Sequence, residues 1–139
     1  YFAMAQLQEG IAPTDWEEVF KRGHSILGDF VDSPLAAHFR GVEIVARELP
    51  FTCPAAWLDP RSEALMGTGL IDLIYRDTDG TLVVADWKVS QSNDHDALRS
   101  RYRAQLQAYA RVVQSLMPGA PLRAELVLVA SGERVEVPL

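Results

Sequence analysis

The sequence predicts an α/β domain with a mixed central β-sheet flanked by helices. Two helical patterns of apolar residues, one near the N-terminus and one from about residue 97 to 117, support the helices. Short apolar segments between and after these helices have the character of strands. The order helix, strand, hairpin, helix and two strands is typical of a sheet with both parallel and antiparallel neighbours.

The first helix is predicted within the segment IAPTDWEEVFKRGHSILGDFV. Thr14 and Glu17 have the spacing of a capping box at its start. Its apolar stripe consists of Trp16, Val19, Phe20, Leu27, Phe30 and Val31. His24 lies at the edge of this stripe, and Ser33 followed by Pro34 predicts a short second helix.

The strands are predicted from apolar segments and the turn residues between them. Residues 41–51 predict a strand, and residues 51–67, which include two prolines, predict a loop. A hairpin follows at residues 69–89. After the long helix, the segments LRAELVLVA and RVEVPL predict the last two strands.

The length of 139 residues predicts a single domain. We expect residues 1–12 to be a linker or tail and residues 13–139 to form the domain. Because the sequence starts at Tyr1 rather than at a methionine, we expect a fragment of a longer protein. No apolar run approaches the roughly 20 residues that span a bilayer, and no signal-peptide pattern is present, so we expect a cytoplasmic protein.

Composition restricts the kinds of site that the chain can form. Its single cysteine, Cys53, excludes an internal disulfide framework and a four-cysteine zinc or iron–sulfur site within the chain. The net charge of −6 argues against a nucleic-acid binder that depends on an overall basic surface. It leaves open a site where metal ions offset carboxylates locally. His38 and His95 are expected to be surface residues.

Three charged residues, Asp72, Asp86 and Lys88, interrupt the apolar strands of the 69–89 hairpin. The residues Thr78-Asp79-Gly80 suit a three-residue turn with the glycine in the left-handed region. That turn sets a register in which Asp72 lies directly opposite Asp86.

In this register the two faces of the hairpin are both mostly apolar. One face is expected to hold Leu70, Asp72, Ile74, Leu82, Val84, Asp86 and Lys88. The other is expected to hold Ile71, Leu73, Tyr75, Val83, Ala85 and Trp87. The two carboxylates would then be like charges on a covered sheet, which destabilises the hairpin unless something compensates.

Three compensations are available for the paired carboxylates: a shared proton, a cationic side chain or a metal ion. Lys88 is close in sequence, but one ammonium leaves the trio negative. Mg²⁺ commonly binds one or two carboxylates together with water and phosphate oxygens, so we favour a metal. The alternative is a salt bridge of Lys88 at the strand ends, and a register slip of one residue would separate the two aspartates.

Several short motifs occur together in the chain: Gly69-Leu-Ile-Asp72, Asp86-Trp87-Lys88 and Tyr102-Arg-Ala-Gln105-Leu106-Gln-Ala-Tyr109, together with Glu48-Leu-Pro-Phe51 and His24 in KRGHSILGDF. With these motifs the sequence resembles the PD-(D/E)XK nuclease superfamily, in particular its RecB-like branch. The end of the chain is similar to the end of the nuclease domain of the RecB and AddA helicase–nuclease subunits. Val89 departs from the threonine that many members have after the lysine.

The resemblance implies a restriction-endonuclease-like fold, a magnesium-dependent deoxyribonuclease and a role for each motif residue. Asp72, Asp86 and Lys88 would be catalytic, and Mn²⁺ is expected to substitute for Mg²⁺. The metal ligands would be His24, Asp72, Asp86 and the backbone carbonyl of Trp87, with Glu48 as a further ligand or a strand-end charge. Substrate would be bound by Gln105, Tyr109, Arg99 and Arg103, although each of these has a structural alternative as a core or surface residue.

The resemblance also implies a place in a larger machine. The absence of the cysteines of the iron–sulfur members favours the RecB/AddA type, in which a helicase motor in the same chain, with or without a second subunit, delivers single strands of DNA during double-strand break repair and recombination. Two alternatives are a standalone restriction or repair nuclease and a catalytically silent module that binds nucleic acid or protein. The intact set of Asp72, Asp86 and Lys88 favours the enzyme.

Overall fold

Five strands form one mixed sheet in the computed structural model, which describes residues 16–139. The helices are α2 (Trp16–Val31), α3 (Pro34–Gly41), α4 (Ala55–Leu58) and α5 (His95–Leu116). The strands are β1 (Glu43–Pro54), β2 (Met66–Arg76), β3 (Leu82–Lys88), β4 (Leu122–Leu128) and β5 (Glu133–Glu136).

The strands lie in the sheet in their sequence order, from β1 at one edge to β5 at the other. Neighbouring strands are antiparallel except for β3 and β4, which are parallel and are joined by α5. A parallel pair needs such a crossover connection, whereas the antiparallel pairs need only turns. The predicted α/β class with a mixed sheet is therefore confirmed.

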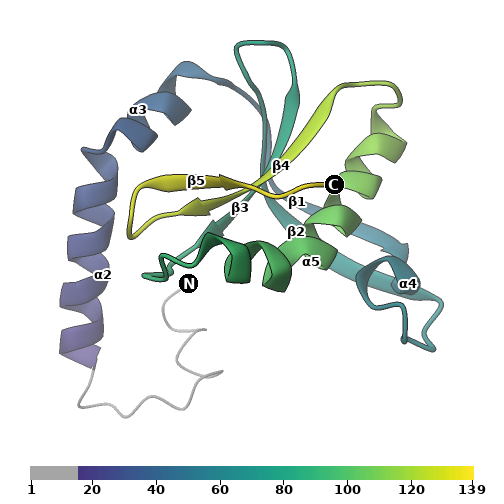
Figure 1. Cartoon of the computed structure of the whole chain (residues 1–139), viewed down its shortest axis with the longest axis horizontal. Coiled ribbons are helices and arrows are strands. Elements are labelled where there is room, and N and C mark those ends of the chain that lie inside the picture. Colours follow the sequence, from purple (N-terminus) through teal and green to yellow (C-terminus); the bar gives the residue numbers. More distant parts are fainter. Residues whose placement is uncertain (1–15) are drawn as a thin grey trace.

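Helices cover both faces of the sheet and bury two separate apolar clusters. On one face α5 contributes Leu98, Leu106 and Val113 to a cluster with residues from every strand. On the other face α3 contributes Leu35, and α2 and α3 pack Phe30 and Phe39 against it. Figure 1 shows α5 and the α2–α3 pair as separate layers around the twisted sheet. Strands covered on both sides explain why the hairpin sequence is almost continuously apolar.

Side-chain caps fix the starts of two helices. Ser33 Oγ accepts from the Ala36 N–H at 3.2 Å and confirms the predicted start of α3. Asp94 Oδ1 accepts from the Ala97 N–H at 2.9 Å, so α5 begins at His95, two residues before its predicted start. The predicted capping box at Thr14 lies outside the described residues.

Within residues 16–139, no helix combines the length and apolar character needed to cross a membrane.

The segment predicted as a loop at residues 51–67 is the main error in the predicted elements. β1 continues through residues 51–54, and α4 follows directly. Phe51 and Cys53 alternate into the core beneath α5, and the Phe51 ring covers Gly69 so closely that an added Cβ there would lie 2.3 Å from it. Prolines are tolerated in this strand because β1 is at the edge of the sheet.

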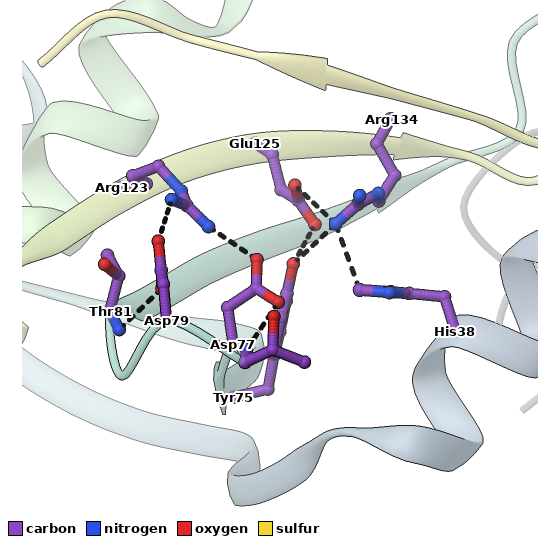
Figure 2. Close-up of polar contacts among 9 residues, drawn as sticks. His38, Tyr75, Asp77, Asp79, Thr81, Arg123, Glu125 and Arg134 are labelled. Carbon is purple, nitrogen blue, oxygen red and sulfur yellow. Dashed lines mark hydrogen bonds and ion pairs between the residues drawn. The ribbon is translucent and has the colours of Figure 1, made fainter.

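The β2–β3 hairpin has the predicted turn and register. Gly80 has a φ of 84°, and the Asp77 N–H donates to the Thr81 carbonyl at 2.9 Å. Arg76 pairs with Leu82, and the ladder continues to the pair of Leu73 with Ala85. Arg123 of β4 forms ion pairs with Asp77 and Asp79 and so ties the turn to the sheet (Figure 2).

The predicted assignment of side chains to the two faces of the hairpin is wrong at Ile71. Ile71 packs in the same cluster as Ile74 beneath α5, whereas Leu73 and Tyr75 pack in the opposite cluster. Strict alternation along β2 is therefore interrupted between Ile71 and Leu73, at the position of Asp72. The change coincides with an irregular backbone conformation in the neighbouring strand β1.

A partly buried polar network joins α3 to the sheet on the face opposite α5 (Figure 2). The Tyr75 hydroxyl donates to Glu125 Oε1 at 2.8 Å and accepts from Arg134 at 3.1 Å. Arg134 also donates to His38 Nε2 at 3.0 Å. His38 is therefore half-buried rather than the simple surface residue expected from the sequence. Burial lowers the pKa of His38 below 6.5, and the charge of Arg134 lowers it further while Asp77 opposes the change.

We expect stability to fall on mild acidification because of His38. Its pKa is lower in the folded chain, so the neutral imidazole stabilises the fold; this contribution is complete above about pH 6.5 and is lost as the pH falls through the folded pKa. Urea unfolding of His38→Gln between pH 7 and 5 should show a weaker loss than wild type. His24→Gln, on exposed α2, is the matched control and should behave as wild type; equal slopes for all three proteins would contradict the role of His38.

Candidate active site

The two aspartates of the hairpin lie where β2 and β3 separate. Backbone pairing between these strands ends at Leu73 and Ala85, although β3 continues beside β4 as far as Lys88. Asp72 and Asp86 are the next residues along each strand. Because β2 no longer pairs with β3 at this point, the Trp87 N–H has no backbone acceptor in β2 and donates instead to Asp72 Oδ2 at 2.9 Å. The side chain of Asp72 thus replaces a missing backbone partner and is held against β3.

Asp86 is a buried carboxylate with incomplete compensation. It is 2% exposed, and its Oδ2 lies 2.6 Å from Nζ of Lys88. The contact is ionic, because within the described residues Oδ2 lacks a hydrogen bond of normal geometry. Burial raises the pKa of the Asp86 carboxyl, Lys88 opposes the rise, and Asp72 adds to it. One ammonium, that of Lys88, thus lies beside two neighbouring carboxyl groups.

Strand alternation sends Trp87 to the other face from its neighbours Asp86 and Lys88. Its indole packs against Phe30 of α2 and Phe39 of α3, with ring centroids 5.7 and 5.1 Å away. The ammonium of Lys88 lies on the α5 side, 4.5 Å from the centre of the Tyr102 ring. The tripeptide Asp86-Trp87-Lys88 thus anchors β3 on one face and presents its charges on the other.

Helix α5 places Gln105 and Tyr109 near the acidic pair. Gln105 Nε2 donates to the Tyr109 hydroxyl oxygen at 2.6 Å, which leaves the hydroxyl proton available for another acceptor. Burial raises the pKa of Tyr109; Gln105 opposes the rise, and the negative charges of Asp86 and Asp72 add to it. The ring of Tyr109 packs edge-on against Phe51 at 5.4 Å. The motif on α5 therefore faces the hairpin, as its spacing predicts.

A cavity of about 530 Å³ opens beside Asp72 on the side of α3. Its polar lining comes from Arg47, Glu48 and Asp72, and its apolar wall includes Phe39 and Trp87. Arg47 is an exposed residue, and the described part of the chain provides its side chain with no hydrogen bond or ion pair. Arg47 was not predicted at the site, because strict alternation places it on the opposite face from Glu48.

Glu48 has an unusual backbone conformation that brings it to this cavity. Its φ is +47°, the only positive value among non-glycine residues in the described region 16–139. Glu48 lies opposite Asp72, between the pairs Arg47–Leu73 and Leu49–Ile71. A left-handed residue interrupts the regular alternation of side chains between the two faces of its strand. The paired strand β2 shows the same interruption at Ile71, which is the partner of Leu49 in β1. The sequence carries no signal for it, because Glu is not a residue that favours this region.

Three residues expected at the site are not brought to it. His24 is exposed on α2, and in residues 16–139 no three histidine, cysteine, aspartate or glutamate side chains are grouped so that they could hold a metal. Arg99 instead binds Asp96 at 2.9 Å and the Glu136 carbonyl at 3.0 Å. Arg103 is exposed to solvent. Of the two α5 arginines expected to bind substrate, one is thus held by groups within the fold and the other lies in solvent.

The described residues nevertheless fit a hard divalent cation in chemical character. Mg²⁺ accepts a site with one or two carboxylates and completes its coordination with water and phosphate oxygens. Asp72 and Asp86 supply two such carboxylates, and the single ammonium of Lys88 cannot offset both charges.

Comparison with known proteins decides the family. The family model of the PD-(D/E)XK nuclease superfamily matches residues 5–138. The chain belongs to the PD-(D/E)XK nuclease superfamily. The five-stranded mixed sheet with flanking helices agrees with the restriction-endonuclease-like core expected of it. Asp72 and the Asp86-Trp87-Lys88 tripeptide are the residues of this chain that match the D…(D/E)-x-K signature.

Three curated relatives are named as the same subunit of an ATP-dependent helicase/nuclease. The protein of Desulforudis audaxviator is 34% identical over 107 residues, which is 70% of this chain and 9% of that protein. Those of Lysinibacillus sphaericus and Acetivibrio thermocellus are 26% and 29% identical, and each match covers 63% of this chain and 8% of the relative. The chain thus spans less than a tenth of the length of the curated relatives it matches.

We expect Asp72→Asn to stabilise the metal-free domain. The amide oxygen of asparagine can still accept from the Trp87 N–H, while the like charge beside Asp86 is removed, which should raise the free energy of unfolding by about 0.5–1 kcal/mol in chelator. Mg²⁺ in large excess over its dissociation constant should stabilise wild type by about 2–3 kcal/mol and the variant much less. Asp29→Asn, on exposed α2, is the control for the loss of one carboxylate. A variant that is destabilised in chelator and keeps the full Mg²⁺ effect would contradict this description of the pair.

We expect Glu48→Gly to raise the free energy of unfolding by about 0.5–1 kcal/mol. Left-handed backbone costs an ordinary residue about 1–2 kcal/mol, and glycine avoids this cost while losing about 0.5–1 kcal/mol through its extra chain entropy. The control is Thr52→Gly in the same strand, where φ is negative and where a loss of about 1 kcal/mol is expected. Chemical denaturation measures both values, and equal losses in the two variants would show that Glu48 is not strained.

Proposed function

We propose that this domain hydrolyses phosphodiester bonds in DNA with the help of a divalent cation, Mg²⁺ or, in its place, Mn²⁺. The observation that carries the proposal is the pair of aspartates at the point where β2 and β3 separate, one of them buried, with Lys88 in contact. A fold gains nothing in stability from two adjoining carboxylates, so their arrangement is best explained by a ligand that offsets them. Membership of a nuclease superfamily supplies the chemistry.

The residues of the site have distinct roles in this proposal. Asp72, Asp86 and the backbone carbonyl of Trp87 would hold the cation, which supplies an acidified water and stabilises charge on phosphate oxygens. Lys88 would orient the attacking water and stabilise the negative charge that develops at phosphorus. Glu48 lines the same cavity as Asp72 and would bind an outer water or the cation.

Substrate contacts are proposed on both sides of the aspartates. The free hydroxyl proton of Tyr109, fixed by Gln105, would donate to a phosphate oxygen. Arg47, which lines the cavity of Asp72, is better placed for a second phosphate than Arg99, which is bound to Asp96 and β5. Arg103 would contact DNA only beyond the site. His24 would join the cation only if α2 brought it to the carboxylates.

The larger context is proposed from the names of the relatives. We propose that residues 13–139 form the nuclease domain of a helicase–nuclease, with residues 1–12 as a linker. A helicase motor in the same chain, with or without a second subunit, would deliver single strands during repair of double-strand breaks in the cytoplasm. Delivery by a motor is consistent with a net charge of −6, because the domain itself need not attract DNA over a long range. The single cysteine leaves no iron–sulfur cluster within the chain.

We expect Lys88→Gln to lower the rate of DNA cleavage by at least about 100-fold, because a positioned cation in a low-dielectric site contributes strongly to the transition state. The chain has two lysines, so Lys21→Gln on exposed α2 is a matched control that should cleave like wild type. Cleavage of labelled single-stranded DNA in Mg²⁺ is measured by gel, and thermal unfolding verifies that both variants fold. Undiminished cleavage by Lys88→Gln would refute the proposed role of Lys88, whereas a folded wild-type chain that cleaves no DNA would favour a silent binding module.

A further inference from the structure

The ring of Tyr102 holds a position at the site that no motif role explains. Its centroid lies 4.5 Å from Nζ of Lys88, and the Lys88 side chain is only 23% exposed. Tyr102 is half-buried and packs against the core cluster beneath α5. The described residues form no hydrogen bond to its hydroxyl group. The feature of Tyr102 that the site uses is therefore the face of the ring rather than the hydroxyl.

A bound cation would weaken the other contact that holds Lys88. In the structure the ammonium of Lys88 is attracted by Asp86, whose Oδ2 lies 2.6 Å away. A divalent ion on Asp86 would take up the charge of this carboxylate and would also repel the ammonium. Lys88 then needs a group that attracts a cation but does not compete for the metal. An aromatic face meets both conditions, because its quadrupole attracts ammonium and its carbon atoms are not ligands for Mg²⁺.

We propose that Tyr102 is a positioning residue that keeps the Lys88 ammonium at the reaction centre when Asp86 binds a metal. This inference rests on the proposed nuclease function and adds a residue to it. Tyr102 acts through Lys88 and not on the substrate, so its loss should lower kcat and leave KM nearly unchanged. A cation–π contact in a partly desolvated site corresponds to a loss of about tenfold in kcat.

A second cationic side chain, that of Arg101, also lies near the Tyr102 ring and offers an alternative explanation for the position of the ring. The Arg101 guanidinium lies 5.3 Å from the Tyr102 centroid, but Arg101 is exposed and adjacent in sequence. If the ring served Arg101, removal of that charge would have the same effect as removal of the ring. Arg101→Gln should instead retain the kcat of wild type.

The contact between Lys88 and the Tyr102 ring can be measured by NMR without any catalytic assay. The chain has two lysines, so the signals of Lys88 need to be distinguished only from those of Lys21. Protons above an aromatic face resonate upfield, so the ε-methylene signals of Lys88 in lysine-labelled protein should be shifted upfield from those of Lys21. Lys21 is exposed and paired with Glu17, and Lys21→Arg assigns its signals. The upfield shift should persist in Tyr102→Phe and in the presence of Mg²⁺, and should vanish in Tyr102→Leu.

The electrostatic role is separated from simple packing by fluorination. Phenylalanine, 4-fluorophenylalanine, 3,4,5-trifluorophenylalanine and pentafluorophenylalanine at position 102 have similar volumes but progressively weaker ring quadrupoles. Tyr102→Phe should have a kcat for DNA cleavage in Mg²⁺ close to that of wild type. From phenylalanine to pentafluorophenylalanine, kcat should fall stepwise by about tenfold in total, while KM stays constant. Thermal unfolding of each protein confirms that the fold is retained.

Each outcome has a definite meaning. A flat kcat across the fluorinated series, Lys88 signals that coincide with those of Lys21, or a loss in Arg101→Gln equal to that in Tyr102→Leu would overturn the role of Tyr102. A wild-type chain that shows the upfield Lys88 signals but cleaves no DNA would refute the proposed function and would support the contact between Lys88 and the ring.

Discussion

The constraint on which the site depends is the separation of β2 from β3 after the pair Leu73–Ala85. Continued pairing would satisfy the Trp87 N–H with a backbone carbonyl and would leave no role for Asp72. Separation leaves this N–H to be bound by the carboxylate of Asp72, which brings a second negative charge beside Asp86. Pairing with β4 holds β3 in place as far as Lys88, so the strand keeps its shape although one neighbour has departed.

The two helical layers give the separated strand end two different environments. On the side of α2 and α3, Trp87 is enclosed by Phe30 and Phe39, and this packing fixes the rotation of the strand. On the side of α5, Lys88 contacts the Tyr102 ring, and Gln105 holds Tyr109. The packing of Trp87 on one face thus fixes the position of β3, so that the charged side chains of the same strand are held in place on the other face.

Much of the fold could be predicted from sequence because its signals are local. The turn at Gly80 fixes the hairpin register, and this register places Asp72 and Asp86 side by side. The reversal at Ile71 could not be predicted, because it depends on the left-handed conformation of Glu48 in another strand. The contact of Lys88 with Tyr102 was missed for a similar reason: it depends on how α5 crosses the sheet, and helical spacing alone marks Tyr102 only as a core aromatic residue.

A comparison of the two buried carboxylates in the described chain indicates which of them serves function. Glu125 and Asp86 are 7% and 2% exposed, and burial raises the pKa of both. Glu125 accepts a hydrogen bond from Tyr75 and lies 3.7 Å from Arg134, so its oxygens have partners within the fold. Asp86 has an ion pair with Lys88 through Oδ2, and a second carboxyl group, that of Asp72, lies beside it without a cation of its own among the described residues. The same sheet therefore satisfies one buried acid internally and leaves the other incomplete, as expected where an external cation completes the site.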